Sequence, residues 1–470
     1  MDNLAFREEA DSIGNLLVPV EAYYGIQSLR AKQNFNITGK TIHKELIIAL
    51  AKLKKSCALT NNASGRMSSE ITDAIVKACD EIIEGKWHNE FIVDAIQGGA
   101  GTSANMNANE VIANRAIELL GGKKGDYKIV HPNDHVNMSQ STNDIYPSAG
   151  KLALVSLLKP LYKELDRLYQ SLMNKAKEFD GILKMGRTQL QDAAPMRLGQ
   201  SFHAFATAIK RDTLNLGRAE EDIHNLNMGA SAIGSAITVD GYYLDNIVST
   251  ISEVCGEKYE QVDDLFDGTS NIEVYVKLSG ALKTLAVTLS KMCNDLRLMS
   301  SGPKTGLNEI NLPARQNGSS IMPGKVNPVI PEVVSQVAYK VFGNDVTVNF
   351  SAEAGQLELN AFEPVIFYSL FESIECLKNA IITLIDNCID GITANPNRCN
   401  DLLEHSVGMA TALTPFIGYI EAAKLAKEAL KTGVPLRQLV LERGLMDKEK
   451  LEEVMSPFEV TEPHHFKKNI

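Results

Sequence analysis

Apolar residues recur at alternating steps of three and four positions in three stretches of the chain, residues 158–172, 278–299 and 370–388. Leucine is the commonest residue at these positions, with isoleucine, methionine and cysteine at the others. Apolar positions spaced about 3.5 residues apart form a single seam along a helix, and such seams are buried by packing nearly parallel to other helices. The pattern therefore predicts a bundle of long helices in the middle of the chain.

Shorter amphipathic stretches flank this bundle. Residues 41–60 and 106–120 precede it, and residues 418–431 and 446–455 follow it. A pair of glycines directly after residue 120 is a helix stop signal. Runs that alternate between polar and apolar residues, as half-buried strands do, are scarce, and no alternation of strands with helices is visible. We therefore predict a mainly all-α fold.

The chain has 470 residues, which is typical of about three domains. A polar loop and a segment rich in proline and asparagine offer the two boundaries. We predict an N-terminal domain at residues 1–141, a central helical bundle domain at residues 142–395 and a small C-terminal helical domain at residues 396–470.

Charge and composition narrow the classes of function. Lys and Arg number 47 against 58 Asp and Glu, for a net charge of −11. Such a chain repels polyanions, so we expect no nucleic-acid partner, and an anionic substrate must be drawn in by a local group of donors. The seven cysteines include no C-x-x-C pair, and the nine histidines form none of the common zinc patterns, so no metal site is predicted. The acidic amino terminus and the lack of a long apolar run predict a soluble, cytoplasmic protein that does not bind membranes.

The segment GSSIMPGKVNP, residues 318–328, is the most informative polar stretch. Its glycines and lysine suggest a phosphate-binding loop, but the Walker pattern has four residues between its glycines and Ser or Thr after Lys. Here five residues separate Gly318 from Gly324, and valine follows Lys325. The segment is better interpreted as a mobile loop that carries two serines, with Lys325 and Asn327 able to fix a carboxylate.

The segment GGAGTSAN, residues 98–105, matches the loose dinucleotide fingerprint, which is significant only between a strand and a helix. No strand is predicted before it, so a tight turn is the favoured interpretation. Residues 139–144, SQSTND, contain a capping-box-like pair, Ser141 and Asp144. Three adjacent polar side chains exceed what a cap needs, and at a helix N-terminus they can bind an anion. A fourth polar cluster, GRTQLQD, spans residues 186–192.

GSSIMPGKVNP resembles the hallmark loop of the aspartase/fumarase superfamily, and the other three clusters follow in the order that this family shows. The resemblance runs from VPVEAYYGIQSLRA at residues 18–31 to SPFEVTEP near the end of the chain. GAGTSANMN, MGRTQLQDAAPM and KVNPVIPEVVSQVAYKVFGND are similar to the aspartase branch. Class II fumarases more often show GTQ, a histidine at position 189 and KVNPT.

This resemblance implies a three-domain fold with a central long-helix bundle, a homotetramer and a lyase that converts L-aspartate reversibly to fumarate and ammonia without a cofactor. The proton beside the β-carboxylate is very weakly acidic, so its removal requires preorganised donors that stabilise the aci-carboxylate. By the resemblance, the base is Ser319, in the mobile loop. The implied substrate-binding residues are Ser141, Thr142 and Asn143 at the β-carboxylate, Thr188, Lys325 and Asn327 at the α-carboxylate, and Thr102, Asn143 and Gln189 around the amino group.

Two segments depart from the aspartase pattern. Gly234–Thr238 reads GSAIT where the family usually has GTGLN, and His131–Asp134 is closer to the fumarase form of a secondary anion loop. Three alternatives therefore stay open. The first is a class II fumarate hydratase, in which water replaces ammonia. The second is a dinucleotide-dependent dehydrogenase, which rests only on GAGTSA. The third is a catalytically silent structural member of the superfamily, against which the intact loop at residues 318–328 argues.

Overall fold

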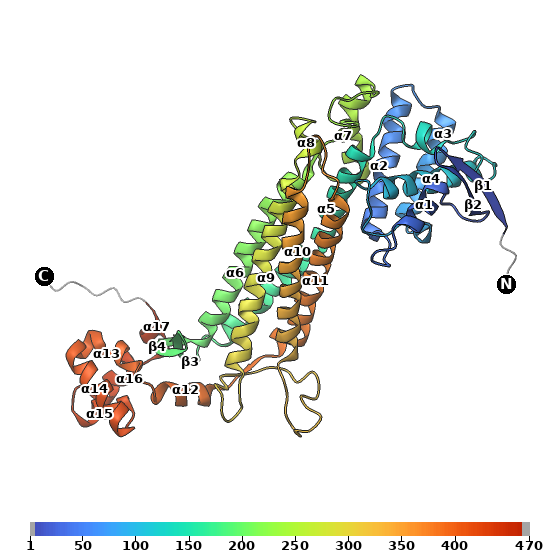
Figure 1. Cartoon of the computed structure of the whole chain (residues 1–470). Helices are drawn as coiled ribbons and strands as arrows, with labels where there is room; N and C mark the ends of the chain where they lie inside the picture. Colours follow the sequence, from blue (N-terminus) through green and yellow to red (C-terminus); the bar gives the residue numbers. More distant parts are fainter. Residues whose placement is uncertain (1–4, 463–470) are drawn as a thin grey trace. The chain divides into compact units, whose positions relative to one another are not determined.

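Helices make up most of the computed structural model, which describes residues 5–462 (Figure 1). The predicted all-α class is confirmed. The chain folds into two compact units, each assembled from three segments. Unit 1 comprises Met1–Tyr162, Leu214–Thr284 and Tyr339–Leu377, and unit 2 comprises Lys163–Thr213, Leu285–Ala338 and Lys378–Ile470. The three-domain division stays a prediction, and its outermost residues, 1–4 and 463–470, lie outside the described part of the chain.

Five long helices each contribute residues to both units: α5 (Thr142–Glu178), α6 (Leu198–Glu220), α9 (Glu273–Met299), α10 (Val329–Glu353) and α11 (Glu363–Asn387). The predicted seams lie on α5, α9 and α11, and their residues are buried. In unit 2, Ser290 Oγ of α9 lies 3.4 Å from Ser335 Oγ of α10, and Arg167 of α5 pairs with Asp386 of α11 at 2.7 Å. The apolar repeat thus produces near-parallel packing of neighbouring helices, as the seams predicted.

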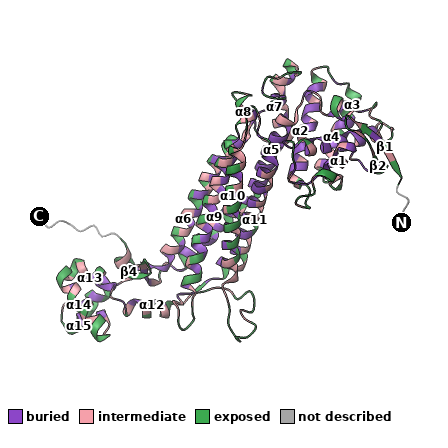
Figure 2. Cartoon of the chain, in the orientation of Figure 1, coloured by how far each residue is buried: buried purple, intermediate pink, exposed green. Residues whose placement is uncertain are grey.

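Unit 1 surrounds the helix α4 (Thr102–Leu119), which is buried along nearly its whole length (Figure 2). Most of its buried side chains are alanine or asparagine, which are small enough for neighbouring elements to pack closely against it. Short helices and strands complete the unit. They are β1 (Phe6–Asp11), β2 (Gly14–Pro19), α1 (Ile26–Asn34), α2 (Lys44–Ala63), α3 (Ser69–Ile83), η1 (His88–Glu90), η2 (Pro132–Val136), η3 (Glu221–His224), β5 (Asn225–Leu226), α7 (Gly241–Cys255), β6 (Glu260–Gln261) and α8 (Asp267–Ser270).

Unit 2 contains an antiparallel hairpin and a group of short helices with its own apolar core. The core gathers Met185 from the hairpin with Leu413, Leu425 and Val440 from three of these helices. The elements are β3 (Leu183–Thr188), β4 (Gln191–Arg197), β7 (Ile310–Asn311), η4 (Ile389–Gly391), β8 (Thr393–Ala394), α12 (Pro396–Glu404), α13 (Met409–Ile417), α14 (Tyr419–Thr432), α15 (Leu436–Glu442), α16 (Lys448–Val454) and α17 (Pro457–Thr461).

The sequence patterns missed several elements. The strands of the two hairpins, β1–β2 and β3–β4, and the helices α3, α6 and α10 were not predicted. Within residues 5–462 no helix is both long enough and apolar enough to cross a membrane.

Candidate active site

The predicted site residues divide between the two units. Thr102 and the trio Ser141, Thr142 and Asn143 belong to unit 1, whereas Thr188, Gln189 and the loop at residues 318–328 belong to unit 2. In unit 1 the first turns of α4 and α5 meet, because Asn105 Nδ2 donates a hydrogen bond to Thr142 Oγ1 at 3.0 Å. Thr102 opens α4 and is exposed. The structure therefore brings two of the four polar clusters together within unit 1.

The glycine-rich turn before α4 depends on left-handed backbone. Gly99, Ala100 and Gly101 have φ angles of 86°, 53° and 87°. A Cβ on Gly101 would lie 2.3 Å from the ring of Tyr146, so only glycine allows α5 to approach this closely. No strand of the described chain leads into this turn, since the preceding element is the short helix η1. Residues 99–101 form a tight turn directly before α4, as that interpretation of the sequence predicts.

The start of α5 is fixed by a reciprocal cap. Asp144 Oδ1 accepts the N–H of Ser141 at 2.9 Å, and Ser141 Oγ accepts the N–H of Asn143 at 3.2 Å. The other carboxylate oxygen, Asp144 Oδ2, accepts the N–H of Ser231 at 3.0 Å. Burial raises the pKa of Asp144 to about 7, although these N–H groups favour its charged form. One buried carboxylate thus joins the polar trio to the segment around residue 231.

Asn143 and Thr142 are held in ways that suit different substrate groups. Asn143 Nδ2 donates to the carbonyl oxygen of Ala232 at 2.7 Å. This bond uses one of the two Nδ2 hydrogens, so the second can donate to a carboxylate, and Oδ1 can accept from an ammonium group. Thr142 Oγ1 accepts from Asn105 and keeps its own proton for donation, which fits a carboxylate.

The departing segment Gly234–Thr238 is backbone-strained. Ala236 has φ of 53° and Thr238 has φ of 70°, in the left-handed region that L side chains rarely adopt. The family pattern has glycine and asparagine at these positions, the two residues that best tolerate this region. The substitutions have therefore changed the side chains while the backbone keeps a conformation typical of the family residues.

In unit 2, Thr188 and Gln189 lie at the tip of the hairpin formed by β3 and β4. Thr188 pairs with Gln191, so Gln189 and Leu190 form a two-residue turn, and their φ angles are 53° and 63°. Such turns normally use Asn-Gly or Asp-Gly, because both central residues need positive φ. Strained backbone of this kind is concentrated at functional sites. The exposed position of Gln189 in a strained turn favours a role in binding.

A buried ion cluster anchors this hairpin. Glu309, which is fully buried, pairs with Lys184 at 3.0 Å and with Arg187 at 2.7 Å. Removing one partner from such a buried group leaves an uncompensated charge, which costs about 3–5 kcal/mol. The hairpin is therefore firmly attached to the segment that leads into the loop at residues 318–328. No sequence motif indicated this cluster, since Glu309 and Arg187 are 122 positions apart.

Hydrogen bonds join the two ends of the loop at residues 318–328, here called its neck, whereas the tip of the loop is exposed. Gly318 N donates to the carbonyl oxygen of Lys325 at 2.8 Å, and Asn327 Nδ2 donates to the carbonyl oxygen of Gly318 at 2.8 Å. A Cβ on Gly318 would lie 2.2 Å from the carbonyl oxygen of Lys325, so the neck requires glycine. Ile321 at the tip is 84% exposed. This geometry suits a loop that moves as a unit about a fixed neck.

Ser319 lies just inside that neck with donors directed at its hydroxyl. Its Oγ accepts the backbone N–H groups of Ile321 at 3.2 Å and Met322 at 3.0 Å. Two N–H groups that converge on one oxygen stabilise negative charge there. Lys325 is exposed, and in the described chain no carboxylate lies within ion-pairing distance of it. No hydrogen bond in residues 5–462 joins Thr188 or Gln189 to this loop.

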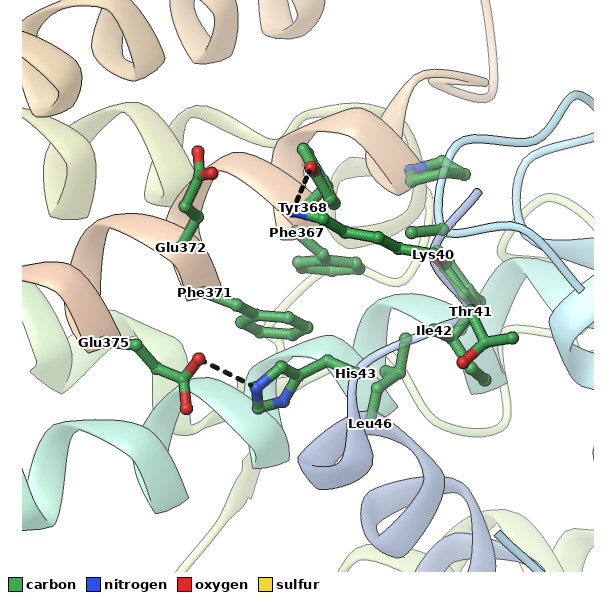
Figure 3. A pocket seen from close by; sticks show the side chains of 13 residues that line it. Lys40, Thr41, Ile42, His43, Leu46, Phe367, Tyr368, Phe371, Glu372 and Glu375 are labelled. Carbon is green, nitrogen blue, oxygen red and sulfur yellow. Dashed lines mark hydrogen bonds and ion pairs between the residues drawn. The ribbon is translucent and has the colours of Figure 1, made fainter. Parts of the chain in front are cut away.

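Figure 3 shows a cavity of about 200 Å³ in unit 1 that is separate from these clusters. Lys40 Nζ donates to Tyr368 Oη at 3.3 Å, and His43 Nε2 lies 3.3 Å from a carboxylate oxygen of Glu375. Phe367 and Phe371 contribute stacked rings to its wall. Its lining carries two carboxylates, from Glu372 and Glu375, beside Lys40 and His43, and none of the predicted site residues lines it. Within residues 5–462 no three His, Cys, Asp or Glu side chains are grouped as metal ligands.

Comparisons with known proteins identify the class. A family model described as lyase matches residues 14–343, and one described as fumarase C C-terminus matches residues 409–462. A curated aspartate ammonia-lyase from Bacillus sp is 50% identical over 461 residues, which cover 98% of each chain. The chain therefore belongs to this lyase family, and the resemblance to the aspartase/fumarase superfamily is confirmed.

Two solved structures share the whole fold. The crystal structure of a fumarate lyase:delta crystallin from Brucella melitensis bound to cobalt is similar with a TM-score of 0.95 and 46% identity, over 98% of this chain and 100% of that chain. A class II fumarase from Schistosoma mansoni is similar with a TM-score of 0.93 and 34% identity, over the same shares. In sequence the chain is thus more similar to the Bacillus aspartate ammonia-lyase than to this fumarase.

The strained segment generates a stability prediction. Ala236→Gly should raise the free energy of unfolding, because an L side chain in left-handed backbone costs roughly 1–2 kcal/mol. The greater freedom of glycine in the unfolded chain offsets about 0.5–1 kcal/mol of that gain. Ala232→Gly is the matched control, at an exposed alanine without positive φ, and should lower the stability. Chemical denaturation compares the variants, and an equal loss in both would disprove the strain.

Proposed function

We propose that this chain is an aspartate ammonia-lyase that converts L-aspartate reversibly to fumarate and ammonia. The observation that carries the proposal is the pair of backbone N–H groups directed at Ser319 Oγ, since they would stabilise the alkoxide that a serine base requires. The 50% identity to a protein named aspartate ammonia-lyase supports this choice of substrate. Both substrate and product are small dicarboxylates, and the chemistry needs no cofactor.

In the proposed reaction the Ser319 alkoxide takes a proton from the carbon beside the β-carboxylate. The electron pair left on that carbon spreads into the carboxylate as an aci form, for which Ser141, Thr142 and Asn143 supply donors. The pair then forms the carbon–carbon double bond as the carbon–nitrogen bond breaks and ammonia leaves. Thr188, Lys325 and Asn327 would bind the α-carboxylate, whose charge does not change. Closure of the loop at residues 318–328 would exclude water from the aci form.

The leaving group distinguishes the main proposal from the fumarase alternative. Thr102, Asn143 and Gln189 would surround the amino group. Gln189 is neutral at every working pH, whereas a histidine there could carry protons to and from water. The acceptor oxygen of Asn143 also fits an ammonium group, because its Nδ2 already donates to Ala232. These contacts favour ammonia over water.

We also propose that the chain works as a cytoplasmic homotetramer, without a nucleic-acid or membrane partner, whose sites combine segments of several chains. An apolar stripe on α10 supports association. Tyr339, Val346 and Phe350 are 57%, 54% and 72% exposed, and their spacing of seven and four positions puts them on one helix face. Exposed apolar side chains in a row mark a surface that another protein surface covers. A second copy of this helix would supply the matching face.

The reaction itself is the first test. We expect the protein to form aspartate from fumarate and ammonium, and to form little malate from fumarate in water alone. Chromatography of the two mixtures identifies the products. Comparable efficiency with aspartate and malate would contradict the assigned leaving group and favour a fumarate hydratase.

Ser319→Ala should fold normally and lose activity. Loss of a general base lowers the rate by about 10²-fold or more, which corresponds to roughly 2.7 kcal/mol of barrier. Ser320→Ala is the matched control in the same loop and should stay within a few-fold of the wild type. Initial rates of fumarate release measure both variants, with circular dichroism as a check of folding. Wild-type turnover in a folded Ser319→Ala protein would rule out the assigned base.

Subunit mixing tests the composite site. Thr188→Ala and Ser319→Ala chains are each expected to be inactive, but dissociation and joint reassembly should restore activity. If each site takes the two segments from different chains, random mixing gives roughly one quarter of the sites both intact segments. Each variant reassembled alone is the control. Mixed tetramers verified by native mass spectrometry that stay inactive, or an active isolated monomer, would contradict the composite site.

A further inference from the structure

A lysine that the proposed mechanism does not use lies completely buried beneath the polar trio. Lys54 is part of α2, and its Nζ donates to Asn137 Oδ1 and to Gln140 Oε1, both at 2.8 Å. Burial lowers the pKa of Lys54 to about 7. Burying an amine costs free energy unless its hydrogens are bonded, so a completely buried lysine needs a reason beyond packing.

The bond from Lys54 fixes the direction of its partner amide. Lys54 Nζ donates to Asn137 Oδ1, so the Asn137 amide turns its oxygen toward Lys54, and its Nδ2 donates to the carbonyl oxygen of Gln140 at 3.3 Å. Gln140 is fixed in the same sense, because its Nε2 donates at 3.0 Å to the carbonyl oxygens of Val136 and Met138. Lys54 thus holds the oxygen end of the Asn137 amide, while the carbonyl oxygen of Gln140 accepts from the other end.

The orientation of Asn137 also fixes the orientation of two further asparagines. The Nδ2 atoms of Asn105 and Asn109 both lie 3.2 Å from Asn137 Oδ1 and donate to it. Asn105 must present its NH₂ group to this oxygen, and the same Nδ2 donates to Thr142 Oγ1 at 3.0 Å. A chain of donors thus runs from Lys54 through Asn137 and Asn105 to Thr142.

The observed orientation of Asn105 is unfavourable for its own oxygen atom but leaves the hydroxyl proton of Thr142 free. Asn105 is 1% exposed, and its Oδ1 has no hydrogen-bond partner. If Asn105 turned over, that oxygen would face Thr142 and capture its hydroxyl proton. In the observed orientation Thr142 Oγ1 accepts, and no acceptor for its proton is present in residues 5–462. The proton is left for an incoming acceptor such as a carboxylate.

We infer that Lys54 is a positioning residue that, through Asn137 and Asn105, keeps the hydroxyl proton of Thr142 available to the substrate β-carboxylate. The inference rests on the proposed function, in which Thr142 binds that group. Without Lys54, only the 3.3 Å bond from Asn137 Nδ2 to the carbonyl oxygen of Gln140 holds the Asn137 amide. Asn137 and Asn105 can then turn over, and Thr142 loses its role as a donor.

A double-mutant cycle tests this inference on the full-length protein. Lys54→Met removes the donor and keeps a long side chain. We expect its kcat/KM for L-aspartate to fall roughly 10- to 100-fold, as on losing a hydrogen bond to a charged group. Thr142→Val should cause a similar loss, and adding Lys54→Met to Thr142→Val should change kcat/KM less than two-fold. A purely structural role would lower the melting temperature but give the same fold loss in both backgrounds.

Lys55→Met is the matched control. Lys55 is the next residue of α2 but pairs with Asp80 at 2.6 Å and is only partly buried, so its loss should leave kcat/KM unchanged. Wild-type kcat/KM in Lys54→Met, or equal losses with and without the Thr142 hydroxyl, would overturn the inference. So would a loss in Lys55→Met as large as that in Lys54→Met.

Two variants of Asn137 decide the question if Lys54→Met does not fold. Asn137→Asp keeps an oxygen that accepts from Lys54 and Asn105 and loses only the 3.3 Å bond from Nδ2 to the carbonyl oxygen of Gln140, so we expect it to keep clearly more activity than Asn137→Leu. Asn137→Leu removes the acceptor and should lose as much as Thr142→Val. Equal activity in these two variants would overturn the inference.

The wild-type assay separates failure of this inference from failure of the proposed function. If the wild type releases fumarate from malate and not from aspartate, the proposed function is wrong. The same cycle is then measured with malate, because proton removal beside a carboxylate needs the donor from Thr142 in either reaction.

Discussion

The buried carboxylate of Asp144 is the interaction on which the polar cluster of unit 1 depends. Its two oxygens accept N–H groups from Ser141 and Ser231, so it joins the first turn of α5 to a segment far along the chain. Because Asp144 is completely buried, the loss of either bond would leave charge or polarity without compensation. This attachment, with the bonds from Asn105 to Thr142 and from Asn143 to Ala232, holds the trio in place.

The two units prepare their parts of the proposed site in different ways. In unit 1 hydrogen bonds from neighbouring segments hold the polar side chains of Thr142 and Asn143. In unit 2, Glu309 anchors the base of the hairpin, while Gln189 at its tip and the tip of the loop near Ile321 are exposed. Fixed donors suit the site of developing charge, because they need no reorganisation during the reaction. A mobile base suits a site that must first admit its substrate.

Sequence patterns predicted the helices with long leucine-rich seams and missed α3 and α6, whose buried stripes hold more alanine and other residue types, and α10. On α10, buried Val334 and Val341 alternate with exposed Tyr339 and Val346, so apolar residues cover two faces and the period is hidden. The β3–β4 hairpin was not predicted because its turn lacks the glycine or asparagine that is typical of such turns. The polar clusters were visible because they are local in sequence. Their supports were not, since Lys54 acts on residues 83 and 86 positions away.

The distribution of charge among the proposed binding groups follows from where charge changes. A chain with a net charge of −11 must attract a dianion locally. Lys325 is assigned to the α-carboxylate, whose charge is the same in substrate and transition state, so its attraction contributes mainly to binding. In the proposed mechanism the β-carboxylate gains negative charge in the aci form, and the neutral donors assigned to it would bind that form better than the substrate. Only such differential stabilisation lowers the barrier, so fixing the direction of the Thr142 proton affects the rate more than the addition of another positive charge at the α-carboxylate would.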